Sequence, residues 1–451
     1  MQDTICAIAT SLGSGAISII RVSGPDAIFI VNKIFEGKDL TKVESHTINY
    51  GKIMDNKKEI DEVLVSIMKA PKTYTMEDVV EINTHGGVAP TNKVLELLLK
   101  NGCRLAEAGE FTKRAFLNGR IDLTQAEAVM DKINAKTEIQ NELANNNLNG
   151  KVSDLINNLR DDMVEVISNI NVNIDYPEYD DVDIITNDIL KPKINNLKTR
   201  IEEILKESKN GKIIKEGINT VIIGSPNVGK SSLLNELLQE EKAIVTDIAG
   251  TTRDIVEGQI SINGVLLNII DTAGIRDTND KVEAIGVEKS IHAMKTADLV
   301  LYMLNNNEKL SNDNKKLLEN LKNKNYIIIV NKTDLENKLD LNELDEKNII
   351  EMSIKNKKGI EELKNRIIQI FNLTSIETKD PTYISNVRSI GILESCLNKI
   401  KEIEDGIKND YPIDMLEMDI KSIWEELGKI NGTTYEDELL DEMFKRFCLG
   451  K

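Results

Sequence analysis

The segment Gly224-Ser225-Pro226-Asn227-Val228-Gly229-Lys230-Ser231 decides the fold class of the middle of this chain. It has the G-x-x-x-x-G-K-S pattern, in which glycines let backbone N–H groups surround phosphates, the lysine reaches the terminal phosphates and the serine hydroxyl is offered to Mg²⁺. An apolar stretch at 218–223 precedes the segment, and a helical pattern at 230–238 follows it. A chance turn would not need this strand–loop–helix context, so the segment predicts a nucleoside triphosphate site.

Two further motifs would complete a magnesium and phosphate site. Asp271-Thr272-Ala273-Gly274 follows an apolar strand, where its carboxylate can hold the magnesium shell and its glycine can approach the γ-phosphate. Thr251-Thr252 lies in a predicted loop that could bring a hydroxyl onto the ion.

A third pair of motifs predicts the base. Asn331-Lys332-Thr333-Asp334 follows a buried strand, and Asp334 can accept hydrogen bonds from the guanine N1 and N2 donors. Adenine has no such donor pair, so the motif favours GTP over ATP. Ser353-Ile354-Lys355 stands where guanine-binding proteins more often have S-A-K, and backbone contacts there should survive the isoleucine.

The residues that would activate water are less ordinary. Ile275 stands just after the D-x-x-G motif, where Ras-like proteins have a glutamine that orients the attacking water. Catalysis must therefore use another group, which could be a nearby acid, a cation or a second subunit. The alternative interpretation of the local charged residues is that they only form a solvated helix. The charged residues nearby are Arg253, Arg276, Asp280, Glu283 and Glu288.

The pattern of the whole chain predicts a multidomain protein of α+β, all-α and α/β parts. Residues 1–118 mix short strands, such as 16–22, 63–68 and 79–83, with helices, one of them starting at Ser23-Gly24-Pro25. Helical stripes then begin at a Thr124–Glu127 capping box. The predicted parts are an N-terminal α+β domain (1–118), a helical domain in two pieces (119–217 and 372–451) and an inserted Ras-like P-loop GTPase domain (218–371).

Composition excludes several classes of protein. The 451 residues carry a formal net charge of −18, which argues against a general nucleic-acid coat. The four cysteines are scattered, without metal-ligand spacing or the density of a disulfide framework. The apolar runs are shorter than a membrane helix needs, and no basic and apolar leader opens the chain. We expect the cytosol as its compartment.

Motifs along the full length resemble the MnmE (TrmE) family of tRNA-modification GTPases. In the middle these are Asn227, Thr246–Asp254, Asp271–Arg276 and Glu283-Ala284-Ile285-Gly286. In the N-terminal part they are Ile20–Gly24, Glu77–Glu81, His85-Gly86-Gly87 and Gly109–Leu117, and at the end Cys448-Leu449-Gly450-Lys451. Taken alone, His85 reads as a turn residue, because the sequence shows no carboxylate partner for it.

The resemblance implies a potassium-dependent GTPase that forms a homodimer, with contacts through its GTPase domains and with 1–118 as a folate-binding and dimerisation domain. It implies that K⁺ is held by Asn227, Thr251 and the carbonyls of Thr246 and Ile248, and Mg²⁺ by Ser231 and Thr252. Glu283 would orient the catalytic water, alongside Lys230. The motifs and the resemblance together give the predicted GTP-binding residues: Asn227, Val228, Gly229, Lys230, Ser231, Ser232, Thr246, Asp247, Ile248, Ala249, Gly250, Thr251, Thr252, Asp271, Thr272, Ala273, Gly274, Asn331, Lys332, Thr333, Asp334, Ser353, Ile354 and Lys355.

The resemblance also implies a one-carbon site for 5-formyl-tetrahydrofolate or a related folate in the N-terminal domain. The matching positions are Arg21, Glu81, Arg120 and Lys451, and Arg120 stands where family members often have lysine. Without the resemblance, Arg21 and Glu81 would read as surface charges. Cys448 would read as a small buried hydrophobe, whereas the resemblance places it near the substrate site and leaves a catalytic role open.

The function implied is GTP hydrolysis coupled to tRNA wobble-uridine modification at C5, by carboxymethylaminomethyl or aminomethyl addition. The implied partners are tRNA and a flavoprotein of the MnmG/GidA type, in a heterotetramer. A molecular-switch GTPase of the Era-like group, acting in ribosome assembly, is the alternative. A helical scaffold that only dimerises ranks last, since it leaves the nucleotide motifs unexplained.

Overall fold

The computed structural model describes residues 3–175, 187–240, 256–270, 294–321, 324–341, 344, 348–373, 384–435, 437–447 and 450. The chain forms two compact units. The first contains residues 1–130, 147–197 and 395–451, and the second contains residues 131–146 and 198–394. Each unit is therefore assembled from segments far apart in sequence, because an inserted body interrupts a helical region. The predicted domain boundaries at 118, 217 and 371 stay predictions.

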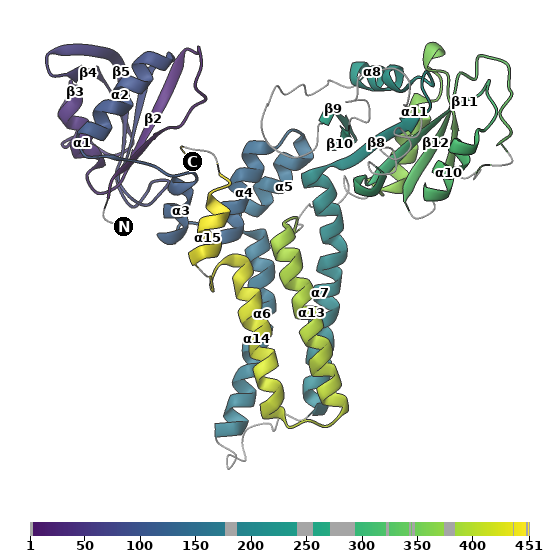
Figure 1. Ribbon diagram of the computed structural model, residues 1–451. Helices are drawn as coiled ribbons and strands as arrows, with labels where there is room; N and C mark the ends of the chain where they lie inside the picture. The colour runs from purple at the N-terminus through teal and green to yellow at the C-terminus, as the bar shows by residue number, and fades with distance from the viewer. Residues whose placement is uncertain are drawn as a thin grey trace. The chain divides into compact units, whose positions relative to one another are not determined.

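The N-terminal part is built on a seven-stranded sheet in the order β3-β4-β5-β6-β2-β1-β7. Neighbouring strands are antiparallel except β1 and β7, which are parallel. Its strands are β1 (Ile5–Ile8), β2 (Ile17–Ser23), β3 (Phe35–Glu36), β4 (Thr47–Asp55), β5 (Lys58–Met68), β6 (Val79–His85) and β7 (Arg104–Leu105). Its helices are α1 (Ala27–Ile34), α2 (Val88–Lys100) and α3 (Glu110–Leu117), as Figure 1 shows.

Alternation along these strands places one side of the sheet in a core. Val63, Val65 and Ile67 of β5 are buried with Ile30 and Val31 of α1. Because strand side chains alternate between faces, the intervening residues of β5 lie on the opposite face. Leu64 is one of them and is exposed.

Two predicted helix starts differ from the structure. Helix α1 begins at Ala27 with Asp26 as its N-cap residue. The Ser23 hydroxyl is instead buried, 2.7 Å from that of Thr75 and 2.8 Å from the Glu77 carboxylate that accepts from it. The capping box predicted at Thr124–Glu127 was wrong by two residues, as the next helix shows.

Helix α4 (Leu123–Asn134) has its capping box at Asp122 and Gln125. The Gln125 backbone N–H donates to Asp122 Oδ1 at 2.9 Å, and the Asp122 N–H donates to Gln125 Oε1 at 3.0 Å. An aspartate is as good an N-cap residue as serine or threonine, so the reciprocal pair forms one position before the helix rather than inside it.

The other helices of the helical region are α5 (Glu138–Leu148), α6 (Lys151–Asp175), α7 (Asn187–Glu216), α13 (Val387–Lys408), α14 (Ile413–Asn431) and α15 (Asp437–Phe444). Helices α6 and α14 run side by side in the first unit (Figure 1). Asn157 and Asn431 share a hydrogen bond of 2.8 Å across this pair, and the guanidinium carbon of Arg160 lies 4.3 Å from the centroid of the Trp424 ring. None of the described helices is long and apolar enough to cross a membrane.

The inserted body is a doubly wound α/β fold around a six-stranded sheet in the order β13-β12-β11-β8-β10-β9. Its strands are β8 (Ile218–Gly224), β9 (Val256–Ile262), β10 (Val265–Ile270), β11 (Leu299–Asn305), β12 (Asn325–Asn331) and β13 (Ile349–Glu351). All described pairs are parallel except β9 and β10. Its helices are α8 (Lys230–Glu240), α10 (Asn312–Leu321), the 3₁₀ turn η3 (Ile354–Asn356) and α11 (Ile360–Ile370).

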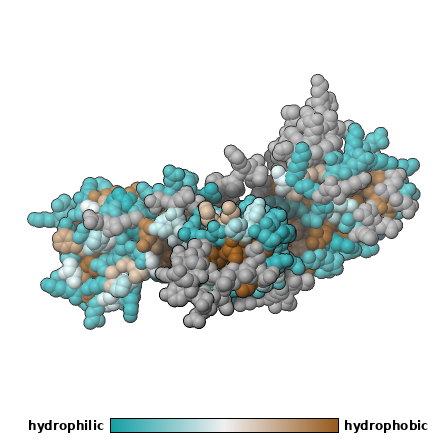
Figure 2. Space-filling view, turned by 90° about the horizontal axis from the view of Figure 1, so that it is seen from below, coloured by the Kyte–Doolittle hydropathy of each residue, from teal (hydrophilic) through white to brown (hydrophobic). Residues whose placement is uncertain are grey.

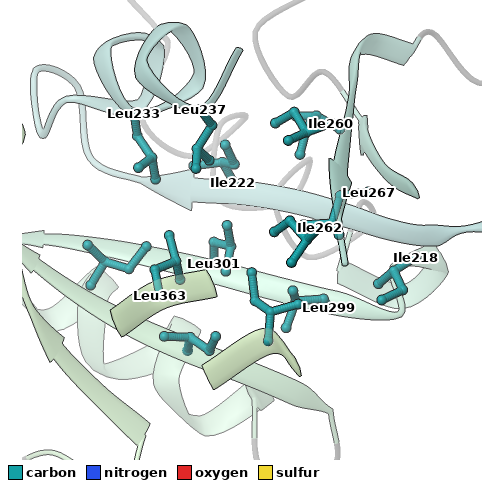
Figure 3. Close-up of a cluster of buried hydrophobic side chains, with 14 of the residues drawn as sticks. Ile218, Ile222, Leu233, Leu237, Ile260, Ile262, Leu267, Leu299, Leu301 and Leu363 are labelled. Atoms are coloured by element: carbon teal, nitrogen blue, oxygen red, sulfur yellow. The ribbon is translucent and has the colours of Figure 1, made fainter. Parts of the chain in front are cut away.

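The central strands β8, β11 and β12 are almost continuously apolar, as expected of parallel strands that are buried on both faces. Figure 3 shows Ile222 of β8 and Leu301 of β11 among side chains from α8, β9, β10 and α11. The two-residue turn Asn263-Gly264 joins β9 to β10, as predicted, with φ angles of 48° and 74°. Positive φ at both positions is what a type I′ turn requires. On the face seen in Figure 2, hydrophilic residues predominate among the coloured ones, as expected for a chain with 29% charged residues.

Candidate functional site

The phosphate loop lies between β8 and α8, at the carboxyl edge of the parallel sheet. Gly224 has φ +149°, and a Cβ there would come within 2.4 Å of the Met303 carbonyl oxygen. Gly229 has φ +105°, and a Cβ there would come within 2.5 Å of Asn331 Nδ2. Both glycines are therefore required by close approach as well as by backbone conformation.

Lys230 lies across this loop. Its ammonium donates to the carbonyl oxygens of Gly224 at 2.9 Å and Ser225 at 3.1 Å. Burial lowers the pKa of Lys230, because desolvation disfavours the charged form. The ammonium is thus held at the mouth of the loop, where the phosphates of a nucleotide would meet the first N–H groups of α8.

The guanine motif is joined to the phosphate loop by two side chains. Asn331 Nδ2 donates to the Val228 carbonyl at 2.7 Å, and Lys332 Nζ donates to the Asn227 carbonyl at 2.8 Å. Asn227 and Lys332 both have positive φ, 62° and 65°, a conformation that non-glycine residues seldom adopt. Two motifs a hundred residues apart in sequence thus form one continuous edge.

The third predicted motif completes this edge. Ser353 Oγ donates to Asp334 Oδ1 at 2.7 Å, and this hydrogen bond is the main cause that lowers the pKa of the Asp334 carboxyl. Asp334 is therefore an ionised, exposed acceptor. The backbone N–H of Ile354 donates to Asn331 Oδ1 at 3.3 Å, a contact that does not depend on the side chain at 354.

Several predicted residues lie outside the described part of the chain. They are Thr246, Asp247, Ile248, Ala249, Gly250, Thr251, Thr252, Arg253, Asp271, Thr272, Ala273, Gly274, Ile275, Arg276, Asp280, Glu283, Glu288, Cys448 and Lys451. Of the predicted metal ligands, Asn227 and Ser231 are described; Ser231 lies in the first turn of α8 and is exposed. The predicted roles of all these residues stay predictions.

Two of the predicted folate-binding residues, Arg21 and Arg120, lie near one aromatic ring, and Glu81 is bonded to Arg21. Arg21 of β2 and Glu81 of β6 are cross-strand partners, with Arg21 Nη2 2.8 Å from Glu81 Oε1. The guanidinium carbons of Arg21 and Arg120 lie 5.7 and 4.8 Å from the centroid of the Tyr74 ring. Arg21 Nη1 also donates to the carbonyl of Gly450 at 3.4 Å, so the end of the chain reaches this group.

Beside this group is an open pocket of about 530 Å³. It is lined by Met68, Pro71, Lys72, Thr73, Tyr74, Met76 and Arg120. The lining combines apolar side chains with two cations, which suits a flat ligand that carries an anionic end. Tyr74 did not emerge from sequence reasoning, although it stands just before the Glu77–Glu81 motif.

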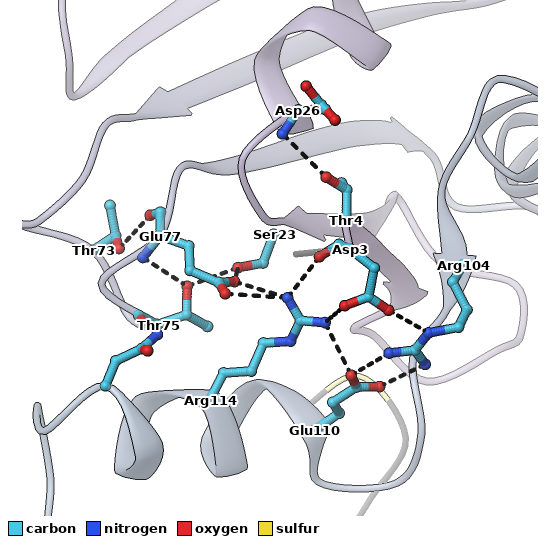
Figure 4. A network of polar contacts seen from close by, with 11 residues as sticks. Asp3, Thr4, Ser23, Asp26, Thr73, Thr75, Glu77, Arg104, Glu110 and Arg114 are labelled. Carbon is cyan, nitrogen blue, oxygen red and sulfur yellow. Dashed lines mark hydrogen bonds and ion pairs between the residues drawn. The ribbon is translucent and has the colours of Figure 1, made fainter. Parts of the chain in front are cut away.

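A buried arginine beneath this site was also missed. Arg114 of α3 donates to Asp3, Glu77 and Glu110, at 2.8–3.2 Å, and its side chain has no exposed surface (Figure 4). Glu77 in turn accepts from Ser23, whose hydroxyl contacts that of Thr75. The network thus fixes the segment that carries Tyr74. A signal was present: Glu110 and Arg114 are charged residues at i and i+4 on a short helix that is otherwise largely apolar.

His85, interpreted from the sequence as a turn residue, is the last residue of β6 and has a carboxylate partner that the sequence did not reveal. Its Nδ1 lies 2.6 Å from Asp61 Oδ1, and its backbone N–H donates to Asp61 Oδ2. The hydrogen bond to Asp61 raises the pKa of His85. Asp61 lies on β5, the strand beside β6, so only the sheet order brings the pair together.

Comparison with known proteins covers the whole chain. The family model described as "MnmE helical domain" matches residues 123–448, and that described as "GTP-binding protein TrmE N-terminus" matches residues 4–120. The tRNA modification GTPase MnmE of Streptococcus thermophilus is 53% identical over 450 residues, which cover 100% of this chain and 98% of that protein. The protein of the same name from Bacillus cytotoxicus is 54% identical over 455 residues, covering 100% of this chain and 99% of its own.

Among solved structures, the G domain of the T. maritima FeoB iron transporter is 27% identical and covers 34% of this chain and 97% of its own length, with a TM-score of 0.26. The full-length matches include the N-terminal and helical regions, which a GTPase body alone would not supply. The chain therefore belongs to the MnmE family of tRNA modification GTPases.

Proposed function

We propose that this chain hydrolyses GTP and uses the hydrolysis to modify C5 of the wobble uridine in certain tRNAs. The observation that carries the proposal is the continuous edge formed by Lys230, Asn331, Lys332 and Asp334 in a chain of this family. An ionised Asp334 accepts from the two donors of guanine, which adenine lacks. No observation favours the Era-like switch as a second candidate.

We propose that hydrolysis depends on potassium and magnesium. The predicted holders are Asn227, Thr246, Ile248 and Thr251 for K⁺, and Ser231 and Thr252 for Mg²⁺. A monovalent cation at this place would supply the positive charge that an arginine finger supplies elsewhere. Glu283 is proposed to orient the attacking water, the task that Ile275 cannot perform. Hydrolysis rates in KCl and NaCl of equal ionic strength test this; equal rates would contradict it.

We propose that the Arg21–Glu81 pair belongs to a site for a formyl-tetrahydrofolate, the one-carbon donor. Glu81 can accept from the amino group and ring N–H of a pterin, and Arg120 and Lys451 can meet carboxylates. The mixed apolar and cationic lining of the neighbouring pocket supports this ligand class. Binding of 5-formyl-tetrahydrofolate, measured by calorimetry on the wild type and Arg21→Met, tests it; equal affinities would exclude Arg21 from the site. A separate proposal is that Cys448 takes part in the chemistry near this site.

We propose a homodimer whose N-terminal domains meet through the uncovered sheet face. Tyr50 and Leu64 are directly opposite each other on β4 and β5, and both are exposed, as is Ile48. These three side chains form an exposed apolar patch on one sheet face, and such a patch often marks a protein interface. Contacts between GTPase domains remain part of the proposal.

We propose that a flavin-dependent partner of the MnmG type forms a heterotetramer with this chain in the cytosol and takes part in the tRNA modification. The formal net charge of −18 supports an arrangement in which the partner provides much of the tRNA-binding surface. A tRNA titration of this chain alone should therefore be weak. Tight binding with a steep salt dependence would contradict this arrangement.

The decisive experiment is nucleoside mass spectrometry of bulk tRNA from cells that lack this protein. The 5-substituted wobble uridines should disappear and return with the wild-type chain, but not with Lys230→Ala. An unchanged nucleoside profile in the deletion strain would refute the proposed function and revive the ribosome-assembly switch, which ribosome profiles would then test.

A further inference from the structure

Residues 131–146, which contain the end of α4, the turn after it and most of α5, are packed against the GTPase body and are called the corner below. The corner belongs to the same compact unit, and Leu143 lies in the same hydrophobic core as Leu267 of β10. A Cβ on Gly264, at the turn of the β9–β10 hairpin, would lie 2.5 Å from Ile139 Cδ1. The tip of the hairpin therefore rests directly on α5.

A chain of hydrogen bonds continues this contact. Lys136 Nζ donates to Gln259 Oε1 of β9 at 2.6 Å, and Gln259 Nε2 donates to Asn268 Oδ1 of β10 at 2.9 Å. Asn268 Nδ2 then donates to the carbonyl of Glu216, the last residue of α7, at 2.8 Å. Asn268 is only 8% exposed, and all three hydrogen bonds are partly buried. One network thus joins the corner, both hairpin strands and the end of α7.

Gln140 links two helix ends with one side chain. Its Oε1 accepts from the backbone N–H groups of Lys136 and Thr137, at 2.7 and 3.2 Å, before the start of α5. Its Nε2 donates to the carbonyls of Ile214 and Lys215, at 3.0 and 3.2 Å, in the last turn of α7. These backbone groups are among those that helix ends leave without intrahelical partners. Gln140 is buried, and it therefore fixes α5 against α7.

In sequence, the hairpin lies between the two segments that are predicted to contact the γ-phosphate and its metal ion. Residues 246–254 lie just before β9, and residues 271–276 directly follow β10. Because the hairpin is joined covalently to both segments, it is the described element through which a change at either segment would act on the rest of the body. Its tip and its Gln259 meet the corner, from which the chain continues into the first unit in both directions.

We propose that the corner is the element through which the nucleotide state of the GTPase body reaches the helical region, with Lys136 and Gln140 as positioning residues. This inference rests on the proposed GTP hydrolysis and assigns the route by which hydrolysis acts on the remainder of the molecule. Coupling of this kind is reciprocal, so whatever holds the corner also biases nucleotide affinity.

The test uses hydrogen–deuterium exchange in the full-length protein, loaded either with GDP or with a non-hydrolysable GTP analogue. Peptides that cover 131–146 should exchange at rates that differ several-fold between the two nucleotides. Lys136→Met should abolish this difference while GTP hydrolysis stays within about twofold of wild type, because Lys136 lies outside the nucleotide edge. tRNA modification in cells should fall with it.

Lys132→Met is the matched control. Lys132 is in the same corner, but its ammonium bonds Asn145 inside the corner and not the hairpin. It should keep both the exchange difference and the modification. Gln140→Glu is a second variant, since a carboxylate facing the two carbonyls of α7 repels them; if it unfolds the chain, Lys136→Met still decides.

Three outcomes overturn the inference. Exchange at 131–146 that is the same with both nucleotides, in a wild type that hydrolyses GTP, refutes the coupling and leaves the proposed function standing. A retained difference in Lys136→Met refutes the role of Lys136. A wild type that binds no GTP refutes the proposed function and the coupling together.

Discussion

Arg114 carries a full positive charge with no exposed side-chain surface, and three carboxylates surround it. Removing one partner of a buried ion pair costs about 3–5 kcal/mol, because the remaining charges lose their compensation. We expect Arg114→Met to lower the free energy of unfolding by this amount. The lone tryptophan, Trp424, lies in the same unit, so its fluorescence in urea reports the change.

Lys113 provides the control for Arg114. It precedes Arg114 on α3 and bonds Asp441, which is half exposed. Exposed pairs contribute about 0–1 kcal/mol, so Lys113→Met should shift the urea midpoint little. Equal losses in the two variants would show that burial does not set the cost.

The same network predicts a dependence on pH. Burial of Glu110 raises its pKa, but hydrogen bonds from Arg104, the Glu107 backbone and Arg114 outweigh it, so the pKa lies below the ordinary 4.5. A hydrogen bond from Arg104 likewise lowers the pKa of Asp3 below 3.8. Carboxyls with depressed pKa values stabilise the fold above their unfolded pKa and lose this contribution as pH falls through the folded one.

Stability of the first unit should therefore decline as the pH falls below 4.5. Thermal midpoints measured between neutral pH and about pH 3 check this. In Glu110→Gln, which cannot ionise, the protein should be less stable at neutral pH and should lose less on acidification. A decline of the same size in both proteins would assign the acid sensitivity to other groups.

Asp334 should determine which base is bound. Asp334→Asn replaces an ionised acceptor by an amide, which loses a charge-assisted hydrogen bond worth about 1.5–3 kcal/mol, roughly 10- to 150-fold in affinity for GTP. The amide can donate to xanthine, which has a carbonyl where guanine has its amino group. Competition between GTP and XTP measures the change; unaltered preference would place the base elsewhere.

At the scale of the element, the capping box of α4 can be tested directly. Asp122→Ala removes acceptors for the Gln125 N–H, the Thr124 hydroxyl and the Ser153 hydroxyl. We expect a loss of about 1–2 kcal/mol, the upper part of the range for N-cap deletions. Asp122→Asn keeps a capping oxygen and should lose less in the same urea experiment. A neutral Asp122→Ala would restore Thr124 as the start of the helix.

At the level of assembly, the proposed dimer through the uncovered sheet face can be tested with one charge. Leu64→Lys places a charge in the exposed apolar patch of Ile48, Tyr50 and Leu64, directly opposite Tyr50. Burying an unpaired charge at an interface costs several kcal/mol, so the proposed dimer should dissociate while the sheet remains folded. Light scattering measures the mass. Leu12→Lys, an exposed apolar residue outside the strands, is the control and should leave the mass unchanged.

The features that could be predicted from the sequence are those whose determining residues lie close together along the chain. The phosphate loop could be predicted because its glycines, the strand before it and the helix after it lie in one continuous stretch of sequence. The turn at Asn263-Gly264 could be predicted because it is formed by two adjacent residues with positive φ. Strand β8 and the apolar strands of the same sheet follow from continuous hydrophobic runs, as fully buried parallel strands require. These features were therefore predictable.

The amino-acid sequence was enough to identify the nucleotide motifs, the class of each part and the family to which the motifs belong. The folded structure was needed to find the partners of Arg114, the Asp61–His85 pair, the contacts that join the guanine motif to the phosphate loop and the packing of residues 131–146 against the hairpin. In each of these cases the two sides come from segments that are distant in sequence. Their meeting depends on sheet order and on how the inserted body divides the helices, and no local pattern of hydrophobicity or charge encodes that arrangement.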